Sequence, residues 1–153
     1  MSQLAAIEEF LGCRRLAVVG VSRSKNDFTR LLFREFVKRG YDVVPVNPEA
    51  GELEGRRCYA QVQEIAPPVE AALVMTPASA TEGVVRDCAT AGVRRVWMYR
   101  ATGQGSVSDA AQAFCREQGM AVSQGCPFMF FPKPGFPHQV HGWLLRVTGR
   151  WPK

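Results

Sequence analysis

The amino-acid sequence predicts an α/β fold in which a doubly wound parallel sheet of about five strands lies between two layers of helices. Two observations support this: short runs that are apolar on both faces alternate with helical segments, and glycine follows most of the helices. The chain has 153 residues, 46% of them hydrophobic and 22% charged, which suffices for one domain with one core. We therefore expect a single domain over residues 1–153, with its core at about 4–127 and a C-terminal extension at about 128–153.

The first half of the chain is predicted to form helices and strands in alternation. The helices cover about residues 4–11 and 27–39, and the strands cover residues 15–20 and 41–46. The second helix carries one apolar stripe, formed by Phe28, Leu32 and Phe36. Asn26 or Asp27 can cap its start. Pro45 has no N–H to donate, so we expect it at a strand end or in an edge strand.

The second half repeats the pattern with three more strands, expected at residues 71–75, 93–98 and 120–122. Ser79 and Glu82 have the spacing of a capping box, which predicts that a helix begins there and continues to about Gly92. Another helix begins at Ser108 or Asp109 and ends at Gly119. Strands that alternate with helices in this way favour right-handed crossovers and a parallel sheet.

A parallel sheet of this kind predicts where a ligand binds. Ligands lie outside the carboxyl ends of the strands, at the point where the strand order reverses. The loops that follow the first four predicted strands are therefore the candidate site, and they cover residues 20–26, 47–49, 76–78 and 99–105.

The first of these loops departs from the dinucleotide-binding fingerprint G-x-G-x-x-G. Gly20 holds the first glycine position, but Ser22 and Lys25 stand at the other two. The acidic residue that would bind a ribose hydroxyl is also missing, since Asn47 and Pro48 follow the second strand. An NAD(P)-binding oxidoreductase is therefore disfavoured, although it stays open as an alternative.

The same loop offers groups that suit a phosphate. Backbone N–H groups lie at the start of a helix, Ser22 supplies a hydroxyl, and Arg23 and Lys25 supply positive charge. The alternative is that both cations are only solvated loop charges. Asn47-Pro48 and Thr76-Pro77 are either ordinary turns or the walls of a ligand pocket. Trp97, in the fourth strand, is interpreted as a core residue.

Several segments carry a resemblance to a known family; they are residues 18–22, 40–48, 55–59, 92–98 and 126–127. Together they resemble the small stand-alone CoA-binding proteins of bacteria and archaea. Those proteins are Rossmann-like domains similar to the N-terminal domain of the succinyl-CoA synthetase alpha subunit. The segment at residues 40–48, G-Y-D-V-V-P-V-N-P, is the most specific part.

The resemblance implies that the ligand is coenzyme A or an acyl-CoA. It implies that the phosphates meet Gly20, Val21, Ser22 and Arg23, that the adenosine end lies by Val46, Asn47 and Pro48, and that Thr76 and Pro77 line the middle of the pocket. Lys25 and Met98 complete the candidate set. No catalytic activity is firmly attached to the stand-alone family, so we expect binding without chemistry and predict no catalytic residues.

Two regions differ from the family. Tyr99 stands where the family usually has glutamine, and Arg100 adds a charge. Both differences are expected to affect the part of the pocket that would hold the pantetheine end of CoA. The tail after Cys126 is rich in proline and aromatic residues. It is expected either to wrap over the domain's own core or to form a homodimer contact.

The five cysteines and two histidines give no strong sign of catalysis or of a metal site. Cys126 follows the fifth strand and is either a nucleophile, a partner for CoA in a mixed disulfide, or a packed core residue. His138 and His141 alone are too few for a zinc site. The open alternatives are thus a CoA- or nucleotide-dependent enzyme that uses Cys126, and an interaction module with a vestigial site.

Charge and hydropathy limit the classes of partner that this chain is expected to bind. The net charge of +5 is dispersed along the chain, which favours an anionic small molecule over a nucleic acid. No apolar run is long enough to span a bilayer, and no secretory signal precedes the first helix. We therefore expect a cytoplasmic protein that binds neither nucleic acid nor membrane.

Overall fold

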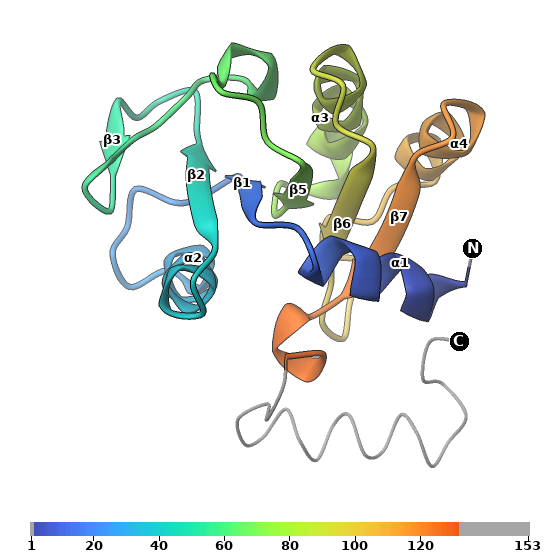
Figure 1. Ribbon diagram of the computed structural model, residues 1–153, viewed down its shortest axis with the longest axis horizontal. Coiled ribbons are helices and arrows are strands. Elements are labelled where there is room, and N and C mark those ends of the chain that lie inside the picture. Colours follow the sequence, from blue (N-terminus) through green and yellow to red (C-terminus); the bar gives the residue numbers. More distant parts are fainter. Residues whose placement is uncertain (1, 132–153) are drawn as a thin grey trace.

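The computed structural model describes residues 2–131, and these form a five-stranded sheet between two layers of helices (Figure 1). The helices are α1 (Gln3–Leu11), α2 (Phe28–Lys38), α3 (Ala78–Thr90) and α4 (Asp109–Glu117). The strands of the sheet are β1 (Arg15–Val19), β2 (Asp42–Val46), β5 (Ala71–Val74), β6 (Arg95–Tyr99) and β7 (Ala121–Gly125). All of them run parallel in the order β2-β1-β5-β6-β7, which confirms the doubly wound, Rossmann-like prediction.

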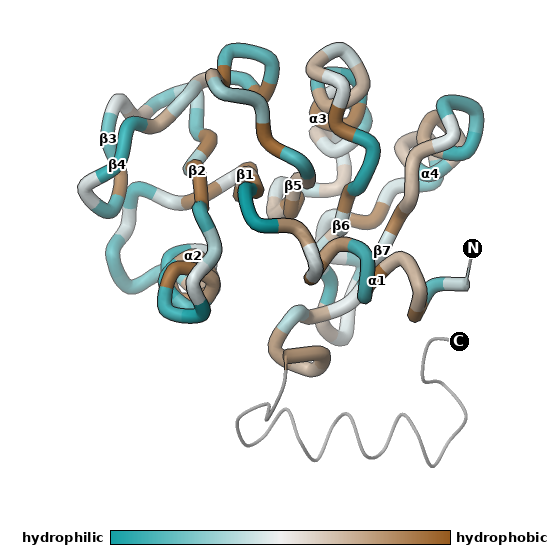
Figure 2. The backbone as a smooth tube through the Cα atoms, viewed as in Figure 1, coloured by the Kyte–Doolittle hydropathy of each residue, from teal (hydrophilic) through white to brown (hydrophobic). Residues whose placement is uncertain are grey.

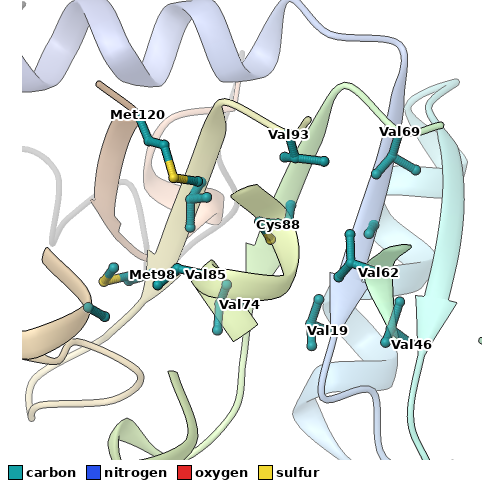
Figure 3. Close-up of a cluster of buried hydrophobic side chains, with 14 of the residues drawn as sticks. Val19, Val46, Val62, Val69, Val74, Val85, Cys88, Val93, Met98 and Met120 are labelled. Atoms are coloured by element: carbon teal, nitrogen blue, oxygen red, sulfur yellow. The ribbon is translucent and has the colours of Figure 1, made fainter. Parts of the chain in front are cut away.

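Each face of the sheet has its own core, because successive side chains of a strand point to opposite faces. In β1, Leu16 and Val18 pack towards α1 and α2 together with Trp97. Ala17 and Val19 pack on the other face, towards α3 and α4. Figure 2 shows hydrophobic residues on the central strands, and Figure 3 shows the cluster beneath α3. Trp97 is fully buried, which confirms its interpretation as a core residue.

The predicted elements are present, most of them within two residues of their expected ends. Asp27 caps α2 by accepting a hydrogen bond from the N–H of Thr29, and Ser108 caps α4. The capping box at Ser79 is wrong. Helix α3 begins at Ala78 with Pro77 as its N-cap, and no side chain caps it.

Four parts of the fold were not predicted, and one of them is a 3-10 turn at Pro127–Met129. A short antiparallel hairpin joins β3 (Glu52–Leu53) to β4 (Arg56–Arg57), and a 3-10 turn follows at Val62–Glu64. Strand β7 also continues to Gly125, past the expected end at residue 122. The hairpin lies beyond the outer edge of β2, at the far end of the sheet from β7 (Figure 1).

Strand β2 is an edge strand, as Pro45 predicted. On its inner side Pro45 lies opposite Val18. On its outer side Tyr59 donates its N–H to the carbonyl of Pro45 at 3.1 Å, and the carbonyl of Tyr59 accepts from the N–H of Asn47 at 2.9 Å. A single bridging residue therefore closes part of this edge.

The start of the C-terminal extension packs on the chain's own core. Phe131 is buried against Phe36 with ring centroids 5.0 Å apart, and Phe130 contacts Trp97 at 5.6 Å. The rest of the extension, with its predicted dimer contact and both histidines, lies outside the described residues, so the single-domain prediction for residues 1–153 stays a prediction. None of the helices within residues 2–131 has the length and apolar character needed to cross a membrane.

Candidate functional site

The candidate site lies at the carboxyl ends of β1 and β5, where the order of the strands in the sheet reverses. These two strands are neighbours, but β1 leads to β2 on one side whereas β5 leads to β6 on the other. Their carboxyl ends approach closely at Gly20, which has a φ of +93°. A Cβ atom at Gly20 would lie 3.0 Å from the carbonyl carbon and oxygen of Met75. Both the conformation and the close approach therefore require glycine here.

The first loop, residues 20–27, is ordered by its own side chains. The N–H of Ser22 donates to the hydroxyl of Thr29 at 2.8 Å, and the hydroxyl of Ser22 accepts from the N–H of Ser24 at 3.1 Å. Arg23 and Lys25 are both exposed at the surface of this loop. The sequence placed these two cations and the Ser22 hydroxyl on one loop, and the structure brings them together there.

The start of α2 already carries a negative charge. The Asp27 carboxylate accepts from the N–H and the hydroxyl of Thr29, at 2.8 and 2.6 Å. These bonds hold the pKa of Asp27 below its usual value, so the carboxylate stays ionised. Because this charge offsets the positive end of the helix dipole, attraction for an anion in this loop comes from Arg23 and Lys25.

Asn47 joins the first loop to the second. Its side-chain N–H donates to the carbonyl of Val21 at 2.9 Å, and its side-chain oxygen accepts from the N–H of Glu49 at 2.8 Å. Glu49 in turn lies 3.5 Å from the guanidinium of Arg23, in an exposed ion pair. Asn47 therefore holds the two loops at a fixed separation.

A cavity of about 390 Å³ opens between the first loop and the β3–β4 hairpin. Its lining residues are Arg23, Lys25, Arg30, Ala50, Gly51, Glu52, Leu53 and Glu54. Arg30, on α2, is the buried cation of this set, with 5% of its side chain exposed. The cavity thus joins the two predicted cations to a third that the sequence analysis did not single out.

The loops after β5 and β6 are held by buried hydroxyl groups. Ser106 donates its hydroxyl to the carbonyl of Thr76 at 2.5 Å, and Thr81 donates to the carbonyl of Ser106 at 2.7 Å. Thr81 and Ser106 are almost fully buried. The hydroxyl of Thr76 lies 3.3 Å from that of Thr81 and is therefore part of this network.

The candidate residues differ in what they can offer a ligand. Three of them have buried side chains, so only their backbone can reach a ligand; these are Val21, Val46 and Met98. Three are half-buried, namely Ser22, Asn47 and Thr76, and four are exposed, namely Arg23, Lys25, Pro48 and Pro77. The side chains that can meet a ligand therefore cluster on the first two loops and at the start of α3.

Tyr99 and Cys126, at the ends of β6 and β7, share a hydrogen bond. Tyr99 also packs on Phe28 with ring centroids 5.4 Å apart. Burial raises the pKa of Tyr99 to about 12 and raises the pKa of the Cys126 thiol. A thiol of this kind is mostly protonated at neutral pH, which disfavours Cys126 as a nucleophile. Within residues 2–131 the half-exposed Arg100 guanidinium has no hydrogen-bond or ion-pair partner.

Sequence reasoning missed Arg30 and Glu54. Arg30 lies on the polar side of an amphipathic helix, where an arginine is ordinarily solvated, and its partner is 24 residues away. The signal that could have suggested the hairpin is the pair Gly51 and Gly55 around Leu53. Within residues 2–131 no group of His, Cys, Asp or Glu side chains is arranged to hold a metal ion.

Comparison with known proteins gives the class. The sequence profile of the CoA binding domain family matches residues 14–132, so the chain belongs to that family. An uncharacterized protein of Bacillus subtilis, YneT, is 27% identical over 119 residues, which cover 77% of this chain and 85% of that protein. The family resemblance seen in the sequence is thereby confirmed.

A second relative is part of a larger protein. The alpha subunit of the ADP-forming acetate–CoA ligase I of Pyrococcus furiosus is 29% identical over 97 residues, which cover 60% of this chain and 21% of that subunit. Among solved structures, a hypothetical protein from Pyrococcus horikoshii superposes with a TM-score of 0.74 at 23% identity, covering 82% of this chain and 86% of that one. This last likeness concerns the fold alone.

Proposed function

We propose that this protein binds coenzyme A or an acyl-CoA at the carboxyl edge of its sheet, between the loops at residues 20–27, 47–49 and 76–78. The observation that carries the proposal is the pair of exposed cations, Arg23 and Lys25, on the first loop of a chain that belongs to the CoA binding domain family. CoA carries a pyrophosphate and a further phosphate, and cations on a loop suit such groups.

The remaining candidates take supporting roles in this proposal. The hydroxyl of Ser22 accepts one hydrogen bond inside the loop and keeps its own proton to donate to a phosphate. Val21 presents its backbone, while Pro48 and Pro77 supply rigid apolar surface. Gly20 and Val46 support the loop, because the N–H of Gly20 donates to the carbonyl of Val46 at 3.0 Å. Met98 supports the strand from within the core.

The proposed role is binding without catalysis. The buried Cys126, whose pKa is raised, supports this because a reactive thiol needs an exposed, electropositive setting. The expectations of a cytoplasmic location, of no nucleic-acid or membrane partner, and of a homodimer through the tail belong to the same proposal. An enzyme that uses Cys126 would instead lose turnover of an acyl-CoA in the Cys126→Ser variant.

The test is binding by calorimetry and thermal shift with CoA, acetyl-CoA, NAD, NADP and ATP. We expect CoA to raise the melting temperature more than the other nucleotides do. In the Arg23→Ala, Lys25→Ala double variant the affinity for CoA should fall by about 10-fold to 100-fold, as the loss of one or two charge-assisted hydrogen bonds implies.

The control is the double variant Arg94→Ala, Arg116→Ala. It removes the same charge from exposed residues that precede β6 and end α4, at the opposite edge of the sheet. Its affinity for CoA should match that of the wild type. If both double variants bind CoA as tightly as the wild type, the phosphate assignment is wrong. If the wild type binds NAD or NADP instead, the oxidoreductase alternative takes precedence.

A further inference from the structure

The turn of the β3–β4 hairpin holds a residue in an unfavourable conformation. Glu54 has a φ of +54° and Gly55 a φ of +68°, and Glu54 is the only non-glycine residue with positive φ within residues 2–131. Two-residue hairpin turns of this kind strongly favour Asn-Gly or Asp-Gly. A glutamate in this position therefore costs the fold stability, and such strain points to a role for its side chain.

The carboxylate of Glu54 binds two arginines of α2. Its Oε1 atom accepts from Nε of Arg30 at 2.8 Å and from Nε of Arg34 at 2.9 Å, and both guanidinium groups contribute a second nitrogen at 2.7 and 2.8 Å. Hydrogen bonding to Arg34 is the main cause that lowers the pKa of Glu54, so the charge persists in mild acid. The shorter asparagine side chain would suit the turn but could not carry this charge.

Arg30 transmits this contact to the first loop. Its Nη1 atom donates to the carbonyl oxygens of Ser22 and Arg23, both at 3.2 Å. The Arg30 guanidinium is buried and bonded within the protein, so it is not available to bind a ligand. Glu54 therefore fixes Arg30, and Arg30 fixes the backbone from which Arg23 and Lys25 project beside the cavity.

The position of the cavity indicates which part of a CoA molecule it suits. Its wall at residues 50–54 begins two residues after Pro48, and the family resemblance implies that the adenosine end lies by Asn47 and Pro48. That end of CoA carries a phosphate monoester on its ribose, and Lys25 is an exposed ammonium group with no hydrogen-bond or ion-pair partner among the described residues. A lysine ammonium group binds phosphate as a point charge.

We propose that the cavity between the first loop and the hairpin receives the ribose phosphate of CoA, and that Glu54 and Arg30 are positioning residues that hold the loop in the arrangement this phosphate needs. The inference rests on the proposed function. It goes further by naming the phosphate and by assigning a role to two residues that do not touch the ligand.

The experiment compares the two carboxylates that line the same cavity. Glu52 is exposed and makes no ion pair within the described residues, whereas Glu54 holds Arg30. If each acts only through its charge, neutralising either one should strengthen the binding of an anion. Positioning predicts opposite signs: Glu52→Gln should bind CoA as well as the wild type or better, and Glu54→Asn should bind it about tenfold more weakly.

Dephospho-CoA lacks the ribose phosphate. The ratio of the affinities for CoA and dephospho-CoA should therefore change only if Glu54 affects the binding of that phosphate, and not if its role is only structural. We expect wild type to prefer CoA over dephospho-CoA, and Glu54→Asn to lose that preference while its affinity for dephospho-CoA stays unchanged. Removing the partner of the buried Arg30 should lower the melting temperature, and the better turn residue offsets only part of this loss, so binding is compared at a temperature at which Glu54→Asn is folded. Arg30→Lys keeps the charge but cannot make the same set of bonds, and it should show the same selective loss.

The outcomes separate this inference from the proposed function. If wild type binds CoA and dephospho-CoA equally, or if Glu54→Asn strengthens CoA binding, the inference is wrong while CoA binding stands. If Glu54→Asn weakens both ligands equally, its role is structural and the inference is also wrong. If wild type binds neither ligand, the proposed function itself fails.

Discussion

At the carboxyl edge of the sheet, the loops after β1 and β2 (the β1–β2 half) carry exposed charged side chains, whereas the loops after β5 and β6 (the β5–β6 half) are held together by buried hydroxyl groups. Arg23 and Lys25 are exposed on the first loop. Thr81 and Ser106, in contrast, are almost inaccessible and bond to each other and to the backbone of Thr76. The two halves have similar strands, but α2 begins with a side-chain cap at Asp27 whereas no side chain caps α3.

We infer from this comparison that the exposed charges serve ligand binding and that the buried hydroxyl groups serve the stability of the fold. Buried hydrogen-bonded groups cost much when one partner is removed, whereas exposed charges contribute little to folding. Substitutions of the buried hydroxyl groups Thr81 and Ser106 should therefore lower stability and leave the folded protein's affinity for CoA intact. Substitutions of exposed charges in the β1–β2 half should lower the affinity for CoA and leave the stability nearly unchanged.

The largest effect is expected for Gly105→Ala, in the loop after β6. Gly105 has a φ of +57°, and a Cβ atom there would overlap the backbone carbonyl oxygen of Tyr99. Left-handed strain and overpacking together should lower the free energy of unfolding by about 3 kcal/mol or more. Urea unfolding followed by tryptophan fluorescence measures this, since Trp97 is fully buried.

Gly103→Ala is its matched control in the same loop. Gly103 does not have a positive φ, and a Cβ atom there meets nothing within 4 Å. We expect a change within about 0.5 kcal/mol, as for an ordinary surface substitution. If both variants lose the same free energy of unfolding, the contact with Tyr99 is not the cause of the loss.

Thr81→Val should have an intermediate effect. Valine has nearly the same shape but cannot donate to the carbonyl of Ser106, which would then be buried without that hydrogen bond. The free energy of unfolding should fall by about 1 to 3 kcal/mol. The affinity for CoA should be unchanged at a temperature where the variant is folded. A variant that is fully stable but binds CoA weakly would contradict the separation of the two halves.

The smallest effect concerns Asp27, at the start of α2 in the β1–β2 half. Its pKa is lowered in the folded state, so its ionised form stabilises the fold above the unfolded pKa of about 3.8, and this contribution is lost as the pH falls through the folded value. Asp27→Asn keeps a capping side chain but removes the charge. It should cost about 0.5 kcal/mol at pH 7.

The difference between wild type and Asp27→Asn should shrink towards pH 3. Urea unfolding at both pH values tests this. An equal difference at pH 7 and pH 3 would mean that the charge of Asp27 has no part in the stability of α2.

The sheet was predictable because its strands are apolar on both faces, and a helix with a regular stripe such as Phe28, Leu32 and Phe36 is equally clear. Polar strand residues were harder to place. Strand β7 continues through Ser123, which is buried beside Trp97, and Gln124, and neither looks like a core residue in the sequence. The start of α3 was misplaced because Pro77 is the N-cap, two residues before the expected cap at Ser79.

The candidate site was predictable only as far as it is local. Ser22, Arg23 and Lys25 lie on one loop, so the sequence alone places them together. The contacts of Thr81 with Ser106 and of Arg30 with Glu54 span 25 and 24 residues. No local spacing rule connects such pairs, because the packing of whole elements brings them together.

Pro45 and Tyr59 have a further consequence for how copies of this chain can meet. An edge strand with free N–H and C=O groups is a template on which another chain can extend the sheet. Strand β2 offers no N–H at Pro45, and the backbone of Tyr59 already bonds both the carbonyl of Pro45 and the N–H of Asn47. Growth of aggregates by strand addition is therefore blocked along this part of β2, next to the loops that carry the candidate site.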